Sequence, residues 1–310
     1  HAEKVTPPKV RSRVKNSRNT HWPIGTLLSS AASGSPINLA KRQMKIAIAQ
    51  INTTIGDFDG NADKIVDAWR RADEAGAALV VLPELALCGY PPRDLLAKPA
   101  FLRQNQEALE SLTKRSGKAV AVVGYASANE TDSGRPAQNS AAVLQDGQVA
   151  AVRHKTLLPN YDVFDEDRYF EPATGNTPVE ILGTKVGITI CEDIWNDEVF
   201  LHDRRYDRRP AEELAGGGAE LLLNLSASPW SLGKEHSRHV LLSQLSVKCG
   251  CPVVYCNLVG GNDELVFDGG SQYYNGHGVL GASGAMFAED LLLVDTETIV
   301  PKSSDTSGDD

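Results

Sequence analysis

Glu84, Lys155 and Cys191 are three chemically capable side chains that each lie at or just past the end of a run with strand character. In an alternating α/β chain, groups at the carboxyl ends of strands collect along one edge of a sheet. A free cysteine in such a place is more often a small buried hydrophobe than a nucleophile. The thiol therefore indicates catalysis only if a base and a cation lie beside it.

The chemistry that these three residue types support together is acyl transfer. A thiol with a pKa near about 8.5 is only a few per cent ionised at neutral pH, so it needs a base, for which the Glu84 carboxylate is a candidate. Lys155 can stabilise a thiolate and can hold the negative oxygen of a tetrahedral intermediate. The backbone N–H of Glu192, the residue after Cys191, is the natural second donor to that oxygen.

Other residues offer competing sites. His154 could pair with the thiol as in papain, but it neighbours Lys155, and adjacent residues on an extended strand point to opposite faces. Three glycines at 216–218 lack the Lys-Ser/Thr that a phosphate-binding loop requires. A metal site is disfavoured, because the available ligands have the spacing of a helix surface rather than of a ligand set. Those ligands are His236, His239, Cys249 and Cys251.

Composition narrows the class of protein. The chain has 310 residues, 41% of them hydrophobic, which is ample for one large core. Its apolar runs fall short of the roughly 18 residues that a membrane span requires. The net charge of −9 argues against a nucleic-acid partner, which needs a basic face. Five cysteines, an odd number, fit a reducing compartment, so we expect a cytoplasmic protein.

The chain divides into three parts by pattern. Residues 1–43 are rich in Pro, Ser, Arg and Lys and show no hydrophobic periodicity, which predicts a disordered basic appendage outside the enzyme proper. Residues 44–300 alternate between strands and helices without a linker, which predicts one α/β domain with mixed sheets covered by helices. The polar tail 301–310 is expected to be disordered.

Strand and helix signals place the elements of this domain. Asp146-Gly147 predicts a hairpin turn, and Asn61 is a candidate helix cap. Gly260-Gly261 and Gly269-Gly270 are interpreted as turns. The expected strands cover 45–51, 77–82, 119–125, 139–144, 149–153, 186–190, 221–225, 253–258, 272–274, 279–280 and 291–294, and the expected helices begin after Asn61 or cover 99–116 and 234–249.

Six segments carry a resemblance to a known family. They are Lys45–Gln50 (KIAIAQ), Leu82-Pro83-Glu84-Leu85, Gly89–Leu96 (GYPPRDLL), Lys155–Phe170, Cys191-Glu-Asp-Ile-Trp195, and Asn224–Pro229 with Gly233-Lys234. Over roughly 44–295 the chain resembles the nitrilase, or carbon–nitrogen hydrolase, superfamily. It is most similar to the N-terminal glutamine amidase domain of glutamine-dependent NAD synthetases. The resemblance implies a nitrilase-like α-β-β-α four-layer sandwich with two mixed β-sheets.

The resemblance also implies roles. Glu84 would be the general base, Lys155 the oxyanion-stabilising cation and Cys191 the nucleophile of a glutaminase. Glu166 would be a second glutamate that orients the lysine. The reaction would pass through a thioester, need no metal or organic cofactor, and supply ammonia for amidation of deamido-NAD, in a protein expected to form homo-oligomers. The glutamine site would be lined by Tyr161, Phe164, Ser228 and Lys234, the last pairing with the substrate carboxylate.

The sequence departs from the family pattern in several places. Asp162 stands where Gly is usual, Leu258 follows Asn257 where Gln is usual, and the hairpin at 272–280 is atypical. The Ser-Gly-Gly-x-x-Ser loop of the ATP- and magnesium-dependent synthetase domain does not occur in the sequence. We therefore expect a synthetase domain or subunit as partner. The alternatives are a free-standing amidase or carbamoylase for another small amide, and a non-catalytic scaffold, which the intact Glu-Lys-Cys set disfavours.

Overall fold

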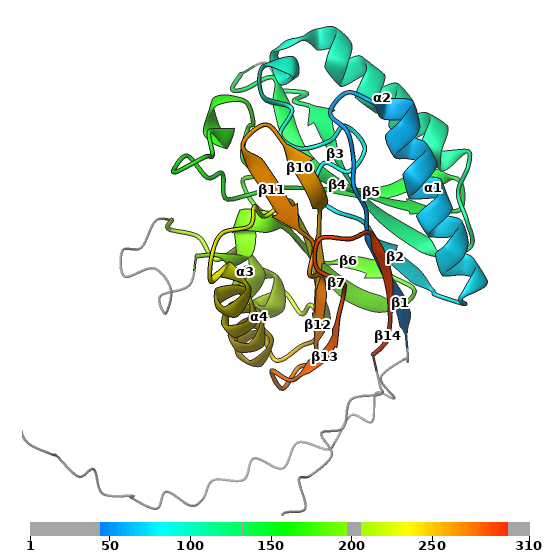
Figure 1. Ribbon diagram of the computed structural model, residues 1–310, viewed down its shortest axis with the longest axis vertical. Coiled ribbons are helices and arrows are strands. Elements are labelled where there is room, and N and C mark those ends of the chain that lie inside the picture. The colour runs from blue at the N-terminus through cyan, green and yellow to red at the C-terminus, as the bar shows by residue number, and fades with distance from the viewer. Residues whose placement is uncertain (1–43, 132, 197–205, 297–310) are drawn as a thin grey trace, which may run out of the picture. The chain divides into compact units, whose positions relative to one another are not determined.

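Two six-stranded sheets stacked face to face form the centre of the fold (Figure 1). The computed structural model describes residues 44–131, 133–196 and 206–296, so the predicted appendage 1–43 and tail 301–310 lie outside the described residues. The strand orders are β14-β1-β2-β3-β4-β5 and β13-β12-β9-β8-β7-β6. Each sheet has three parallel strands in its middle and antiparallel strands at its edges, so both are mixed.

The strand bounds follow the hydrophobic pattern. The first sheet contains β1 (Lys45–Gln50), β2 (Leu79–Val81), β3 (Val120–Ala128), β4 (Ala137–Gln145), β5 (Gln148–His154) and β14 (Asp290–Asp295). The second contains β6 (Val179–Ile181), β7 (Thr184–Ile190), β8 (Leu221–Ser226), β9 (Val253–Asn257), β12 (Gln272–Tyr274) and β13 (Leu280–Ser283). The hairpin predicted at Asp146-Gly147 joins β4 to β5, as the antiparallel register of these strands shows.

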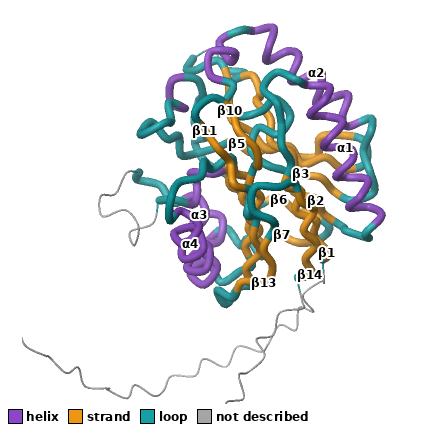
Figure 2. Tube along the Cα trace, in the orientation of Figure 1, coloured by secondary structure: helices purple, strands orange, loops and turns teal. Residues whose placement is uncertain are grey.

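Two pairs of helices complete the layers. The helices α1 (Phe58–Glu74) and α2 (Pro99–Thr113) pack on the first sheet, and α3 (Pro210–Gly216) and α4 (Lys234–Cys249) pack on the second. Figure 2 shows these helices on the outer sides of the strands. The expected order of layers, α-β-β-α, is confirmed. No helix within the described residues combines the length and the apolar character that crossing a membrane requires.

Alternating side chains hold the layers together. On β1, Ile46 and Ile48 belong to the cluster between the two sheets, whereas Ala47 and Ala49 belong to the cluster under α1 and α2. This is the period of two that a strand buried on both faces requires. Short 3-10 helices, η1 (Arg93–Ala97), η2 (Glu166–Arg168) and η3 (Cys191–Ile194), lie in the loops between the regular elements.

Two local predictions were wrong. The first helix begins at Phe58, because Asp57 is its cap and accepts a hydrogen bond from Gly60 N at 3.1 Å. Asn61 lies inside the helix, where its buried amide donates to the carbonyl oxygen of Thr54 at 2.7 Å. The predicted cap therefore serves to fix the preceding loop.

The turn predicted at Gly260-Gly261 is also wrong. These glycines lie inside β10 (Val259–Asn262), which pairs with β11 (Leu265–Asp268) in a separate two-stranded hairpin. Gly260 has φ +123, and a Cβ there would lie 2.3 Å from Oδ1 of Asn52. Close approach and backbone conformation, rather than a chain reversal, require glycine at this position.

Candidate active site

Cys191 lies where β7 stops and η3 begins. The strand runs parallel to β8, with Ile190 opposite Leu225, so the thiol is at the carboxyl end of a parallel pair. Cys191 has φ 42, a left-handed backbone conformation that non-glycine residues rarely adopt. The chain therefore turns sharply at this residue, and strain of this kind is typical of functional sites.

Glu84, three residues past the end of β2, and Lys155, directly after β5, form a buried ion pair. The Nζ of Lys155 is 2.7 Å from Glu84 Oε1 and 2.7 Å from Glu166 Oε2. Glu84 also accepts hydrogen bonds from Asn139 Nδ2 at 2.7 Å and from the backbone N of Ala227 at 2.8 Å. One ammonium thus bridges two carboxylates, and donors from β4 and from the residue after β8 fix the first of them.

Burial and charge set the protonation of this group. Burial lowers the pKa of Lys155, but Glu166 and Glu84 outweigh it, so the pKa lies well above its ordinary value and the amine stays protonated. Burial raises the pKa of Glu166 to about 7, against the lowering effect of Lys155. The hydroxyl of Tyr90 donates to Glu166 Oε1 at 2.7 Å and holds this second carboxylate in place.

The thiol of Cys191 is kept neutral at rest. Burial raises its pKa and Glu84 raises it further, while Lys155 lowers it. Both members of the ion pair thus act electrostatically on the thiol. Because little thiolate is present at neutral pH, the proton has to leave as the sulfur reacts, and a carboxylate such as Glu84 can accept it.

The structure does not support the competing sites. The Nδ1 of His154 lies 2.8 Å from Ser140 Oγ, whereas Lys155 reaches Glu84, so the two neighbours point to opposite faces as predicted. The Nδ1 of His239 lies 2.7 Å from the hydroxyl of Tyr274. Over residues 44–131, 133–196 and 206–296, no three His, Cys, Asp or Glu residues are placed to hold a metal ion.

A cavity of about 440 Å³ opens beside the thiol and is lined in part by Cys191, Glu192 and Trp195. All four residues predicted to bind the substrate line it as well. They are Tyr161, Phe164, Ser228 and Lys234. The structure thus brings together residues from three separate parts of the chain that the sequence alone could not place side by side.

Contacts among the lining residues give the cavity one cationic and one anionic wall. Lys234 Nζ lies 5.3 Å from the centroid of the Trp195 ring, and burial lowers the pKa of this amine. The buried Glu192 carboxylate accepts hydrogen bonds from the hydroxyls of Tyr161 at 2.8 Å and Tyr206 at 3.0 Å. We expected Glu192 to matter through its backbone N–H, so its side chain is a feature that the sequence reasoning missed.

The departures from the family pattern are accommodated locally. Asp162 has φ 55, in the left-handed region that glycine favours and that aspartate tolerates better than most residues. It lines the cavity together with Phe164. Leu258 is buried, and its backbone N donates to the carbonyl oxygen of Ser226 at 3.0 Å. Neither residue displaces the predicted site residues from the cavity.

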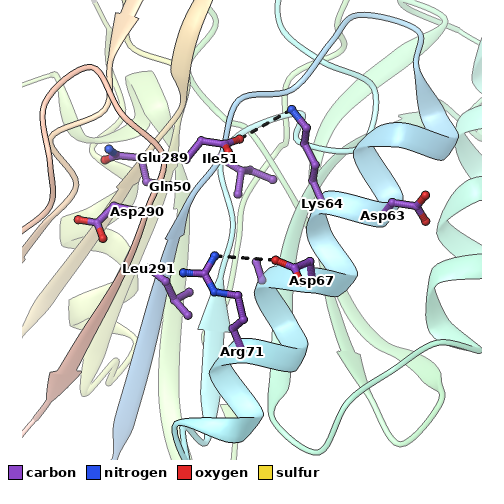
Figure 3. A pocket seen from close by; sticks show the side chains of 10 residues that line it. Gln50, Ile51, Asp63, Lys64, Asp67, Arg71, Glu289, Asp290 and Leu291 are labelled. Carbon is purple, nitrogen blue, oxygen red and sulfur yellow. Dashed lines mark ion pairs between the residues drawn. The ribbon is translucent and has the colours of Figure 1, made fainter.

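A second groove, between α1 and the start of β14, has a different character (Figure 3). Lys64 and Arg71 of α1 point into it, and their ion pairs join Lys64 to Glu289 at 3.7 Å and Arg71 to Asp67 at 3.8 Å. No thiol lines this groove within the described residues. The cavity at Cys191 is therefore the candidate active site.

Asn139, Tyr90 and Asp193 are further site residues that sequence reasoning missed. Asn139 and Tyr90 contact the two carboxylates of the ion pair, and Asp193 follows the thiol by two positions. Asn139 lies in β4 between Gln138 and Ser140, so its polar type does not stand out in the sequence. The contacts of the other two join segments far apart in sequence, so spacing could not indicate them.

Comparison with known proteins agrees with this geometry. A family model for carbon–nitrogen hydrolases matches residues 45–298. The glutamine-dependent NAD(+) synthetase of a Synechocystis species is 44% identical over 253 residues, and that of Thermotoga maritima is 42% identical over 260 residues. These alignments cover 80% and 83% of this chain but 45% and 42% of the relatives. The chain therefore spans less than half the length of these relatives.

Solved structures give the same picture of the fold. The glutamine-dependent NAD+ synthetase of Acinetobacter baumannii, in complex with ADP, superposes with a TM-score of 0.74 at 36% identity, over 82% of this chain and 45% of that one. A nitrilase-superfamily amidase from Nesterenkonia superposes with a TM-score of 0.67 at 25% identity, over 81% of this chain and 90% of that one. The nitrilase-like fold is thereby confirmed, and the chain belongs to the carbon–nitrogen hydrolase family.

Proposed function

We propose that this chain hydrolyses the side-chain amide of glutamine through a thioester on Cys191. The observation that carries the proposal is a cavity at the Cys191 thiol with Lys234 on one wall and Glu192 on another. The buried Lys155–Glu84 ion pair acts electrostatically on the same thiol. Glutamine is a zwitterion at neutral pH, so Lys234 suits its α-carboxylate and Glu192 suits its α-ammonium group. The hydroxyl of Ser228 and the rings of Tyr161 and Phe164 complete the walls.

The first half of the reaction forms the thioester. Sγ of Cys191 attacks the amide carbon while Glu84 takes the thiol proton. The oxygen of the tetrahedral intermediate is stabilised by the Lys155 ammonium and by the backbone N–H of Glu192. The C–N bond then breaks, and Glu84 returns its proton to the departing ammonia.

The second half releases glutamate. Glu84 takes a proton from a water molecule, whose oxygen attacks the thioester carbon, and the C–S bond breaks to restore the thiol with the proton that Glu84 holds. Glu166 keeps Lys155 in place throughout. Since Cys191 and water are the nucleophiles, Glu84 carries the proton and Lys155 holds the oxyanion, the proposed reaction needs no metal and no organic cofactor.

The ammonia would serve amidation of deamido-NAD. This part of the proposal is supported by the name of the Synechocystis and Thermotoga relatives and by their length, of which the chain spans less than half. An ATP- and magnesium-dependent synthetase domain or subunit is the proposed partner. A cytoplasmic location and assembly into homo-oligomers belong to the same proposal.

Direct assay tests the glutaminase reaction. The purified chain, alone and with added synthetase partner, is incubated with glutamine, and glutamate and ammonia are measured. We expect equal amounts of both products from the wild type and none from Cys191→Ala. Equal turnover by Cys191→Ala would refute the proposal.

One observation favours a second candidate, a free-standing amidase for small amides. The chain aligns with 90% of the Nesterenkonia amidase, and in another structure of that enzyme the acetamide moiety of fluoroacetamide has added covalently to the active-site cysteine. Turnover of acetamide with negligible turnover of glutamine would favour this candidate. The charged walls of the cavity favour glutamine.

A further inference from the structure

The carboxylate of Asp193 accepts three backbone N–H groups from two segments of the chain. Its Oδ1 lies 2.9 Å from the N of Thr156 and 2.8 Å from the N of Leu157. Its Oδ2 lies 2.9 Å from the N of Ile190. Asp193 and all three donors are buried, so the bonds are shielded from water.

The two segments are those that carry the amine and the thiol of the site. Thr156 directly follows Lys155, and Ile190 directly precedes Cys191. The strand β5 ends at His154, so the N–H groups after Lys155 do not take part in that strand. A buried N–H without a partner is costly, and Asp193 supplies the acceptor.

We propose that Asp193 is a positioning residue that fixes Lys155 relative to Cys191. A role in closing the turn of η3 alone would need only the bond from Ile190. The bonds from Thr156 and Leu157 cross 37 and 36 positions of sequence and serve no local turn. They join the end of a strand in one sheet to the end of a strand in the other.

Charge strengthens this link. Burial raises the pKa of Asp193 to about 6, while the three N–H groups and Lys155 lower it, so the carboxylate is ionised at neutral pH. Hydrogen bonds to an ionised acceptor are shorter and stronger than neutral ones. A displacement of about 1 Å between reacting groups costs on the order of 10²-fold in rate, so a small loosening of this link is measurable.

The test compares Asp193→Asn with Asp73→Asn. The asparagine at 193 has the same shape, but its amide group faces at least one N–H donor and cannot accept from it. Asp73 is a matched control, because its carboxylate also accepts two backbone N–H groups, from Lys118 at 2.8 Å and Ala119 at 2.7 Å, away from the site. Glutamine turnover and the rate of Cys191 alkylation by iodoacetamide are measured in both.

We expect kcat of Asp193→Asn to fall about 10²-fold with KM changed less than about twofold, because Ser228 and Lys234 line the glutamine pocket from a segment to which Asp193 does not bond. The rate of Cys191 alkylation in Asp193→Asn should also differ from the wild-type rate. Asp73→Asn should match the wild type in both kcat and alkylation rate. Wild-type kcat in Asp193→Asn, or an equal loss in Asp73→Asn, overturns the proposal.

Hydrogen exchange on the wild type tests the link without a variant, in case Asp193→Asn does not fold. The amides of Thr156 and Leu157 should exchange as slowly as those of central strands although they lie outside any strand. Rapid exchange at both overturns the proposal. The inference rests on the proposed glutaminase function for its kinetic readout only. If the wild type does not hydrolyse glutamine, that function fails, while alkylation and exchange still decide the role of Asp193.

Discussion

The Nζ of Lys155 lies 2.7 Å from Oε1 of Glu84, and neither side chain has any exposed surface. Burying two charges costs more than a surface ion pair returns, so such a pair is weak evidence for stability. Its electrostatic action on Cys191, with Glu166 as a second partner of the lysine, fits the catalytic role that we propose for it.

Replacing Lys155 with Met should abolish glutamine hydrolysis and weaken the fold. Glu84 and Glu166 would remain buried without their cation, which typically costs about 3–5 kcal/mol of unfolding free energy. Lys248→Met is the control, because Lys248 pairs with Glu212 at 2.7 Å on the surface. Its loss should stay below about 1 kcal/mol. Chemical denaturation gives both unfolding free energies. Equal losses would show that the buried ion pair contributes no more to stability than the surface pair.

Replacing Glu84 with Gln should remove the base and keep the shape of the side chain. The amide oxygen can still accept hydrogen bonds, but it cannot take the thiol proton, so we expect kcat to fall about 10²–10⁴-fold. Glu289→Gln, in the groove between α1 and β14, changes the same group away from the site and should leave kcat unchanged. Comparable activity in Glu84→Gln and the wild type would rule out this base.

Lys234→Met should raise KM for glutamine more than it lowers kcat. A hydrogen bond to a charged group contributes about 1.5–3 kcal/mol, which corresponds to about 10- to 10²-fold in KM. Small amides without a carboxylate should be unaffected by the change. Steady-state kinetics on glutamine and acetamide separates the two cases, and an equal effect on both substrates would place the carboxylate site elsewhere.

The stability of the protein should depend on Glu166 between about pH 4.5 and pH 7. Burial raises the pKa of this carboxyl to about 7 from its ordinary value of 4.5, so the folded state binds the proton more tightly. That contribution stabilises the fold below about pH 4.5 and is lost as the pH rises through about 7. The glutamine of Glu166→Gln does not titrate, so the variant does not lose stability in this way as the pH rises. Denaturation of both proteins at several pH values should show the variant gaining on the wild type as pH rises, and a constant difference would contradict the assignment.

Much of the fold could be predicted from the sequence, because local pattern determines it. The period of two in β1, the Asp-Gly turn between β4 and β5, and the helix α4, whose bounds at Lys234 and Cys249 match the prediction, depend on neighbouring residues alone. The predictions for the start of α1 and for the segment that forms the hairpin β10–β11 were wrong. In both, a contact with a distant or looped segment outweighs the local signal, as with Gly260 against Asn52.

The site was predicted only in part, because local pattern indicates strand ends but not contacts between distant segments. The strand ends indicated where Glu84, Lys155 and Cys191 lie, and the resemblance to a family supplied Tyr161, Phe164, Ser228 and Lys234. The side-chain contact of Glu192 with two tyrosines and the bonds of Asp193 join segments that spacing does not relate. Hydrogen bonds across two sheets leave no periodic trace in a sequence.

The most direct test of the central claim is to identify the atom that carries the acyl group. Wild-type protein is mixed with glutamine, quenched in acid within one turnover, digested and analysed by mass spectrometry. We predict a glutamyl thioester on the peptide that contains Cys191, and none in Cys191→Ala. An acyl group on another cysteine, or steady release of glutamate by Cys191→Ala, would contradict the proposed mechanism.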